Sequence, residues 1–129
     1  MKYCSLAIFT LCLIIIAGCG SGHVSLKGRV TFSDDGSPLT VGSVILSKPN
    51  FESRGDLNDK GEFVMESLRP RDGIPPGTYG VSIVGATDYS LGGVQMLIDP
   101  KWANPETSGM TIDVDRKTKY LEIKVDRNP

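Results

Sequence analysis

The chain after residue 20 consists of short runs in which apolar and polar positions alternate, separated by Gly, Pro, Asn and Asp. In the first run, 24–32 (VSLKGRVTF), every second position is apolar or Gly28, which is the period of a strand with one buried face. No segment after residue 20 carries the apolar stripe of a helix. The pattern therefore predicts an all-β domain, with strands at 24–32, 41–47, 53–57, 62–66, 78–84, 110–114 and 120–125.

Turn-forming residues separate these runs and predict which strands are neighbours. The turn at 58–61 (NDKG) predicts a hairpin of 53–57 with 62–66, and the turn at 115–118 predicts one of 110–114 with 120–125. Residues 69–77 (RPRDGIPPG) contain three prolines and cannot form a regular strand. We expect a seven-stranded β-sandwich of two antiparallel sheets, because each strand has one apolar face to bury.

The N-terminal segment differs from the rest of the chain. Lys2 precedes a fourteen-residue apolar stretch, 4–17, which is too short for the about 20 residues of a membrane-spanning helix and matches the core of a secretion signal. Ile16-Ala17-Gly18-Cys19 then resembles a lipobox, with Ile16 where Leu is commoner. We predict a signal peptide at 1–18, a lipidated tether at 19–23 with Cys19 as the acylated residue, and a domain at 24–126. A signal cut elsewhere without lipidation and a short membrane anchor are the alternatives.

The cysteine content and the net charge indicate where the protein is located and which partners it does not bind. Cys4 and Cys12 leave with the predicted signal, so Cys19 is the one cysteine kept, and lipidation gives this lone extracytoplasmic thiol a role. The expected location is the cell membrane or outer membrane, lipid-anchored on the extracytoplasmic side. Without Lys2 the chain carries 13 basic and 15 acidic residues, so it has no basic excess for a nucleic-acid partner.

Several motifs together point to a family. The chain resembles the carboxypeptidase regulatory-like (transthyretin-like) β-sandwich in Gly28-x-Val30 with Gly36-x-Pro38, Asn58-Asp59-x-Gly61-x-Phe63 and Pro76-Gly77-x-Tyr79-x-Val81. The blocks 72–79 (DGIPPGTY) and 98–110 (IDPKWANPETSGM) resemble short bacterial lipoproteins built from a single such domain. Over 24–126, the resemblance implies a Greek-key, prealbumin-like or Ig-like sandwich in the cell envelope. It implies no reaction, since such domains are mostly accessory modules.

The residues available for catalysis are few. His23 is the single histidine and lies in the tether, so a 5-hydroxyisourate hydrolase, a zinc peptidase or a nucleophilic triad lacks its histidine. The chain also ends in 125–129 (VDRNP), without the Tyr-Arg-Gly-Ser of that hydrolase family. Catalysis by carboxylates alone stays open. We expect no enzyme activity and no cofactor.

Clustered charges have two interpretations each. Asp34-Asp35-Gly36 and Asp56-x-x-Asp59 contain carboxylates that calcium favours, but turns favour Asp at the same positions, and we expect no metal. Arg69 and Arg71 are either an anion site or part of a solvated loop, and we favour the loop.

Two functional classes remain: a structural or protein-interaction module of the envelope, and a lipoprotein that binds carbohydrate or another small ligand. The candidate binding residues are Trp102, Tyr89 and Lys101, with Phe51 as a further aromatic for stacking on a sugar. For Trp102 we favour packing in the core. The segment 86–108 is long for a connection and rich in apolar residues, so we expect an edge strand at 94–98. Residues 99–109 should then cross one end of the sandwich, and we expect this crossing to be the docking surface for an envelope protein or polysaccharide.

Overall fold

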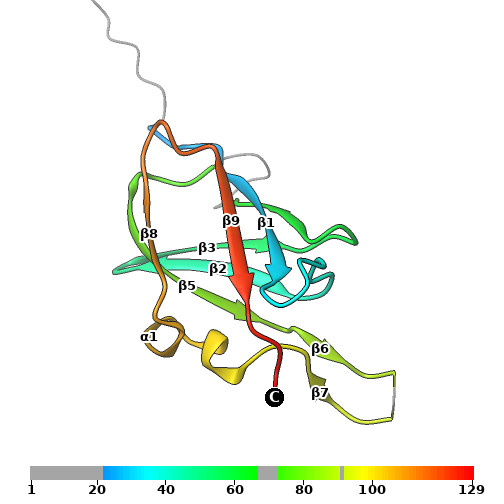
Figure 1. Cartoon of the computed structure of the whole chain (residues 1–129). Helices are drawn as coiled ribbons and strands as arrows, with labels where there is room; N and C mark the ends of the chain where they lie inside the picture. Colours follow the sequence, from blue (N-terminus) through cyan, green and yellow to red (C-terminus); the bar gives the residue numbers. More distant parts are fainter. Residues whose placement is uncertain (1–21, 67–72, 91) are drawn as a thin grey trace, which may run out of the picture.

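The computed structural model describes residues 22–66, 73–90 and 92–129 (Figure 1). The predicted signal peptide, Cys19 and the pair Arg69 and Arg71 lie outside the described residues. The expected all-β class is confirmed, but the expected count of seven strands is wrong: the described residues form nine strands and two short helical turns, and β6 and β7 are a pair outside the two larger sheets. None of the described helices is long and apolar enough to cross a membrane.

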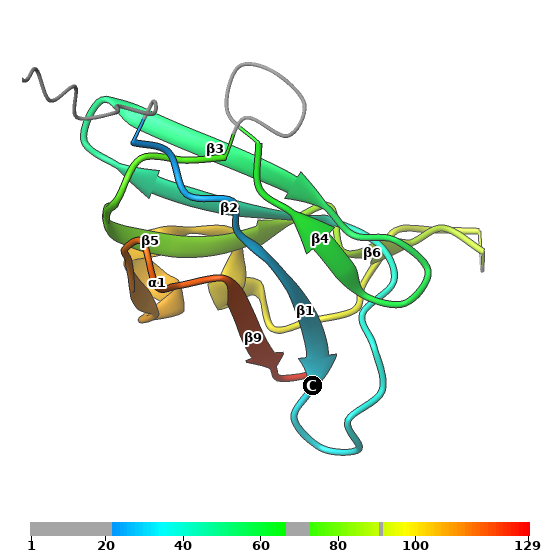
Figure 2. The same ribbon diagram turned by 90° about the horizontal axis from the view of Figure 1, so that it is seen from above.

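Two larger sheets and one strand pair make up the domain (Figures 1 and 2). The three-stranded sheet has the order β4-β1-β9, from Glu62–Val64, Lys27–Phe32 and Tyr120–Val125. The four-stranded sheet has the order β3-β2-β5-β8, from Phe51–Asp56, Ser43–Lys48, Gly77–Val84 and Thr111–Val114. The pair consists of β6 and β7, Thr87–Asp88 and Gln95–Met96, and is followed by the 3₁₀ turn η2 and helix α1, Pro100–Ala103 and Pro105–Ser108.

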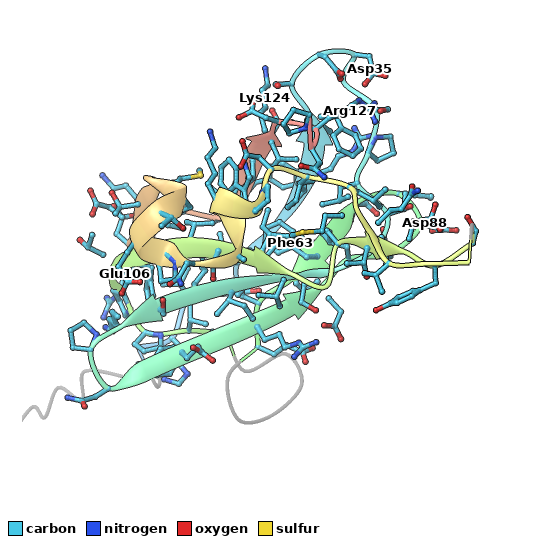
Figure 3. All side chains as sticks on the ribbon, turned by 90° about the horizontal axis from the view of Figure 1, so that it is seen from below. Asp35, Phe63, Asp88, Glu106, Lys124 and Arg127 are labelled. Carbon is cyan, nitrogen blue, oxygen red and sulfur yellow. The ribbon has the colours of Figure 1, made fainter. Side chains whose placement is uncertain are left out.

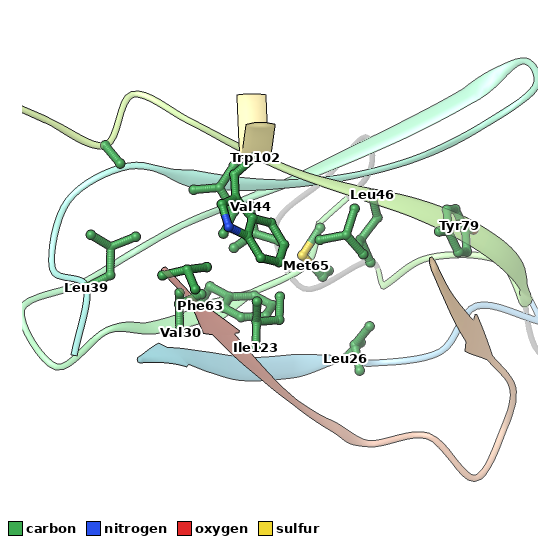
Figure 4. Packing of buried hydrophobic residues seen from close by; sticks show 14 of the residues in the cluster. Leu26, Val30, Leu39, Val44, Leu46, Phe63, Met65, Tyr79, Trp102 and Ile123 are labelled. Atoms are coloured by element: carbon green, nitrogen blue, oxygen red, sulfur yellow. The ribbon is translucent and has the colours of Figure 1, made fainter. Parts of the chain in front are cut away.

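The core lies between the two larger sheets. Figure 4 shows Val30, Phe63 and Ile123 of the three-stranded sheet facing Val44 and Leu46 of the four-stranded sheet. These side chains come from alternate positions of their strands, so the two-residue period read from the sequence selects the buried face. In both ribbon views the strands of one sheet cross those of the other at a large angle (Figure 2).

The expectation of purely antiparallel sheets is wrong for one pair. Strand β9 runs parallel to β1 over its whole length, from Lys27 opposite Tyr120 to Phe32 opposite Val125. Consequently β8 and β9 do not form the predicted hairpin: β8 pairs with β5 in the other sheet. The turn at 115–118 forms, with the Asp115 carboxylate accepting from Lys117 N at 2.8 Å, but it carries the chain between the sheets.

The second predicted hairpin, of 53–57 with 62–66, is confirmed only in part: one antiparallel bridge, Arg54 with Glu66, joins the two segments. The turn at 58–61 forms as expected, with Asn58 Oδ1 accepting from Glu62 N at 2.9 Å and Gly61 at a φ of 75°. However, β3 ends before this turn in one sheet and β4 begins after it in the other. The hairpin partner of β3 is β2, joined through Pro49 and Asn50, and Asn50 adopts the positive φ of 66° that this short loop requires.

Candidate docking surface

Strands β6 and β7 form an arm that projects from the end of β5 (Figure 1). Two residue pairs hold the arm together, Thr87 with Met96 and Asp88 with Gln95. Its base is tied to the body by Leu97, whose N–H donates to Ala86 O at 2.9 Å and whose carbonyl accepts from Asn128 N at 3.2 Å. The predicted edge strand at 94–98 is therefore only Gln95–Met96, in a separate small sheet, because its partner is β6.

The arm presents apolar side chains to solvent. Tyr89, Val94 and Met96 are 67%, 65% and 41% exposed, and they are half of the six large hydrophobic residues that are exposed in the described part of the chain. The loop tip is shaped by Asp88, whose carboxylate accepts from Ser90 N at 2.8 Å (Asp88 is marked in Figure 3). The same hydrogen bond lowers the pKa of Asp88, so the carboxylate stays ionised. This hydrogen bond holds Ser90 beside Asp88, and Tyr89 and Val94 on either side of the tip are exposed.

A small pocket lies at the base of the arm. It has a volume of about 110 Å³ and its lining includes Met96, Ile98, Pro100 and Ala103. This volume is below the about 300–1,000 Å³ of typical small-molecule sites, so the pocket does not suit a drug-sized ligand. Because this pocket lies beside an exposed apolar arm, it has the size to accept a single side chain of a partner protein.

Trp102, the first candidate binding residue, lies in the core. It is 6% exposed and belongs to the hydrophobic cluster, reaching from η2 toward the space between the sheets (Figure 4). Turn η2 holds it there, because Pro100 begins the turn and the Asp99 carboxylate accepts from Lys101 N at 3.0 Å. The packing interpretation of Trp102 therefore fits its position, whereas stacking on a ligand does not. Its Nε1 has no hydrogen-bond partner among the described residues.

The other candidates differ in how accessible they are. Tyr89 is exposed on the arm, whereas Phe51 is half-buried and meets Tyr79 edge-on with 6.1 Å between ring centroids. Lys101 is exposed, but its Nζ lies 3.0 Å from Asp126 Oδ2, and the hydrogen bond with Asp126 raises the pKa of Lys101. Tyr89 is thus the candidate that is free to meet a partner on the arm.

The clustered carboxylates are engaged within the protein. Arg127 lies between Asp34 and Asp35, with its Nε 2.7 Å from Asp34 Oδ2 and its Nη2 3.0 Å from Asp35 Oδ2 (Figure 3). Hydrogen bonds from the Ser37 side chain and backbone, with the charge of Arg127, lower the pKa of Asp35 to about 2. Asp56 accepts from Ser43 Oγ at 2.6 Å. Among residues 22–66, 73–90 and 92–129 no group of three His, Cys, Asp or Glu side chains is arranged to hold a metal.

An open groove of about 710 Å³ runs between the β3 and β4 edges, and sequence reasoning missed its aromatic residue. Tyr120 lines the groove and is 53% exposed, beside charged residues that include Lys27, Arg54 and Glu62. The alternation of 120–125 (YLEIKV) could have identified Tyr120. Ile123 and Val125 point inward, so Tyr120 is an aromatic residue on the polar, outward face of the strand.

The chain has a partial similarity to a protein of known structure. The chain is similar to a DUF3823 family protein from Bacteroides ovatus ATCC 8483, known from a crystal structure, with 17% identity and a TM-score of 0.46. The similarity covers 80% of this chain and 44% of that protein, so the chain spans less than half of its length. No family model and no curated protein matches the chain. The transthyretin-like membership implied by the sequence motifs therefore stays a prediction.

Proposed function

We propose that the protein is a lipid-anchored component of the cell envelope whose non-catalytic domain docks a partner protein through the β6–β7 arm. The observation that carries the proposal is the exposure of Tyr89, Val94 and Met96 on one projecting element. Isolated exposed hydrophobic residues are ordinary, but several on one element mark interaction sites. Aromatic and Met side chains are also the types enriched where proteins meet.

The position of the arm supports this function. The first described residues and the arm lie at opposite ends of the domain in both ribbon views (Figures 1 and 2). If Cys19 carries lipid, the tether of residues 20–23 spans roughly 10–12 Å and keeps the near end of the domain at the bilayer. The arm is then the part of the domain farthest from the membrane, where it can reach a partner in the envelope.

The family resemblance belongs to the same proposal. We propose that the domain belongs to the transthyretin-like, Greek-key sandwiches, and structural roles of two of the motif residues support this. A Cβ on Gly28 would overlap the backbone of Leu121, and the Tyr79 hydroxyl donates to Pro75 O at 2.5 Å. An experimental structure tests the assignment: the strand order should superimpose on the common core of that family, with β6 and β7 as an addition.

Site-specific photocrosslinking in cells tests the arm. A photoreactive phenylalanine analogue replaces Tyr89, and in a matched control it replaces Tyr120, which is also an exposed tyrosine but lies in the groove. We expect a discrete protein adduct from position 89 that disappears when Met96→Lys is added. An identical adduct from position 120, or none from position 89, contradicts docking through the arm.

The lipid anchor needs its own test. Mass spectrometry of the mature N-terminus should find acylated Cys19, since several acyl chains at about 0.8 kcal/mol per buried methylene give stable anchoring. Cys19→Ser should release the protein from the membrane fraction. A mature chain that begins elsewhere, or that carries no lipid at Cys19, contradicts the anchor without affecting the arm.

The second candidate function is carbohydrate binding in the groove. Tyr120 offers a ring for stacking on a sugar face, and Lys27, Arg54 and Glu62 offer hydrogen-bonding groups around it. A glycan array followed by calorimetry on any hit tests this function. Tyr120→Ala should abolish the binding and Tyr89→Ala should leave it unchanged, whereas an array without a hit removes the candidate.

A further inference from the structure

Basic side chains gather at the end of the domain where the described chain begins. Lys27 at the start of β1 and Arg116, Lys117 and Lys119 in the β8–β9 connection are all exposed. The backbone joins the two segments, since Lys27 N donates to Lys119 O at 3.4 Å, and Figure 1 shows them side by side. We call these four residues the basic end.

The basic end surrounds a hollow of about 510 Å³. Lys27, Arg116 and Lys119 line it together with residues 22–25, and none of these described lining residues is a carboxylate. The nearest acidic residues along the chain are engaged by neutral groups: Asp113 accepts from Thr78 Oγ1 at 2.6 Å, and Asp115 accepts from Lys117 N and Thr118 Oγ1. The ion pairs that join one described residue to another are those of Arg54, Lys101 and Arg127.

The opposite end of the same sheet is acidic. Because β1 and β9 are parallel, both run away from the basic end and finish at the opposite end of the three-stranded sheet. Three carboxylates form ion pairs at that opposite end, Asp34 and Asp35 with Arg127 and Asp126 with Lys101. The charge of a fourth carboxylate, Asp99, also raises the pKa of Lys101. The domain is therefore polarised along these strands, although its overall charge is close to balanced.

We infer that the basic end is a docking surface for the anionic headgroups of a phospholipid bilayer. The chemistry it recognises is a layer of phosphate groups, which Lys and Arg bind by charge and hydrogen bonds. The inference rests on the proposed lipid anchor for its location, because Gly22 is three residues from Cys19. Attraction to a charged surface acts within a Debye length of about 8–10 Å, which is close to the reach of the short tether.

Docking in this way fixes the orientation of the domain. The acidic end is repelled by the same surface that attracts the basic end. Strands β1 and β9 therefore point away from the bilayer surface, with their first residues nearest to it. A four-residue tether by itself leaves the domain free to rotate over the membrane. The electrostatic contact holds the basic end down and thereby keeps the β6–β7 arm pointed away from the lipid.

Vesicle flotation of the mature chain, residues 19–129 with Cys19→Ser, tests the inference. This chain contains every described residue, and its core begins at Val24. We expect it to float with phosphatidylcholine vesicles that contain phosphatidylglycerol, but not with phosphatidylcholine alone. Added salt should weaken the association, since it screens charges at the membrane surface.

Matched charge variants locate the contact. Arg116→Gln with Lys119→Gln should reduce partition to anionic vesicles by about 30-fold, because each basic residue at the surface contributes a few-fold. The control pair, Lys60→Gln with Lys124→Gln, makes the same change in net charge on exposed residues away from the hollow and should have little effect.

Four outcomes overturn the inference. The first three are equal binding to neutral vesicles, no binding to anionic vesicles, and an equal loss from the control pair. Displacement by inorganic phosphate beyond that by chloride at equal ionic strength assigns the hollow to a free anion instead, and also overturns it. None of these readings depends on acylation or on the arm, so failure here is distinct from failure of the proposed function.

Discussion

Replacing Trp102 with alanine separates a core role from a docking role. The side chain is 6% exposed and packs in the cluster between the two sheets, so the substitution removes a large aromatic from a filled core. Truncations of this kind cost about 3–5 kcal/mol, because they lose apolar burial and leave a cavity. For a domain of this size that loss lowers the melting temperature by roughly 15–25 °C.

A conservative variant sharpens the test. Trp102→Phe keeps an aromatic ring in the core and removes Nε1, a buried donor without a partner among the described residues. Since a buried unsatisfied donor costs about 1–3 kcal/mol, losing it offsets part of the lost packing, and we expect a change below about 1.5 kcal/mol.

The free energy of unfolding of the wild type, Trp102→Ala and Trp102→Phe is measured by chemical denaturation. Unfolding is followed by circular dichroism, because Trp102 is the single tryptophan and its variants lose the fluorescence signal. Tyr89→Ala is the control, with an expected change within about 0.5 kcal/mol because Tyr89 is exposed. If Trp102→Ala unfolds at the same denaturant concentration as the wild type but no longer forms the arm's crosslink, the core assignment is refuted.

Further predictions concern the sheet, the acidic turn and catalysis. Gly28→Ala should prevent stable folding in thermal melts, because the new Cβ would overlap the Leu121 carbonyl and lie 2.7 Å from Phe63 Cζ. At Gly36 a Cβ meets open space, so Gly36→Ala should lower the free energy of unfolding by only about 1 kcal/mol, because of the positive φ. Because the pKa of Asp35 is lowered, its ionised carboxylate stabilises the folded state above pH 3.8, and this stabilisation is lost as the pH falls toward about 2. Asp35→Asn should therefore flatten the pH dependence of the free energy of unfolding between these two pH values. The purified domain should not hydrolyse 5-hydroxyisourate or peptide esters, and activity abolished by one substitution in the domain would refute its non-catalytic role.

The sequence by itself determined where most strands and turns lie. Alternation over 24–32 and 120–125 fixed both the strand positions and their buried faces, because side chains along a strand point to opposite sides. Asp and Asn at 58–61 and 115–118 fixed the turns, since their side chains bond to their own backbone. The preference for Trp102 in the core also rested on a local property, the size and apolar character of the indole.

Only the tertiary structure decided which strands are neighbours. Alternation identifies the face that a strand buries but not the strand with which it shares hydrogen bonds. One predicted hairpin, of 110–114 with 120–125, is therefore wrong, and the other, of 53–57 with 62–66, is reduced to a bridge between Arg54 and Glu66. The parallel pairing of β1 and β9 joins segments about ninety residues apart, and no local pattern encodes such a contact. That pairing places the basic side chains of the β8–β9 connection beside the first described residues. Strands β6 and β7 pair with each other outside both larger sheets, and Tyr89, Val94 and Met96 of this arm are exposed.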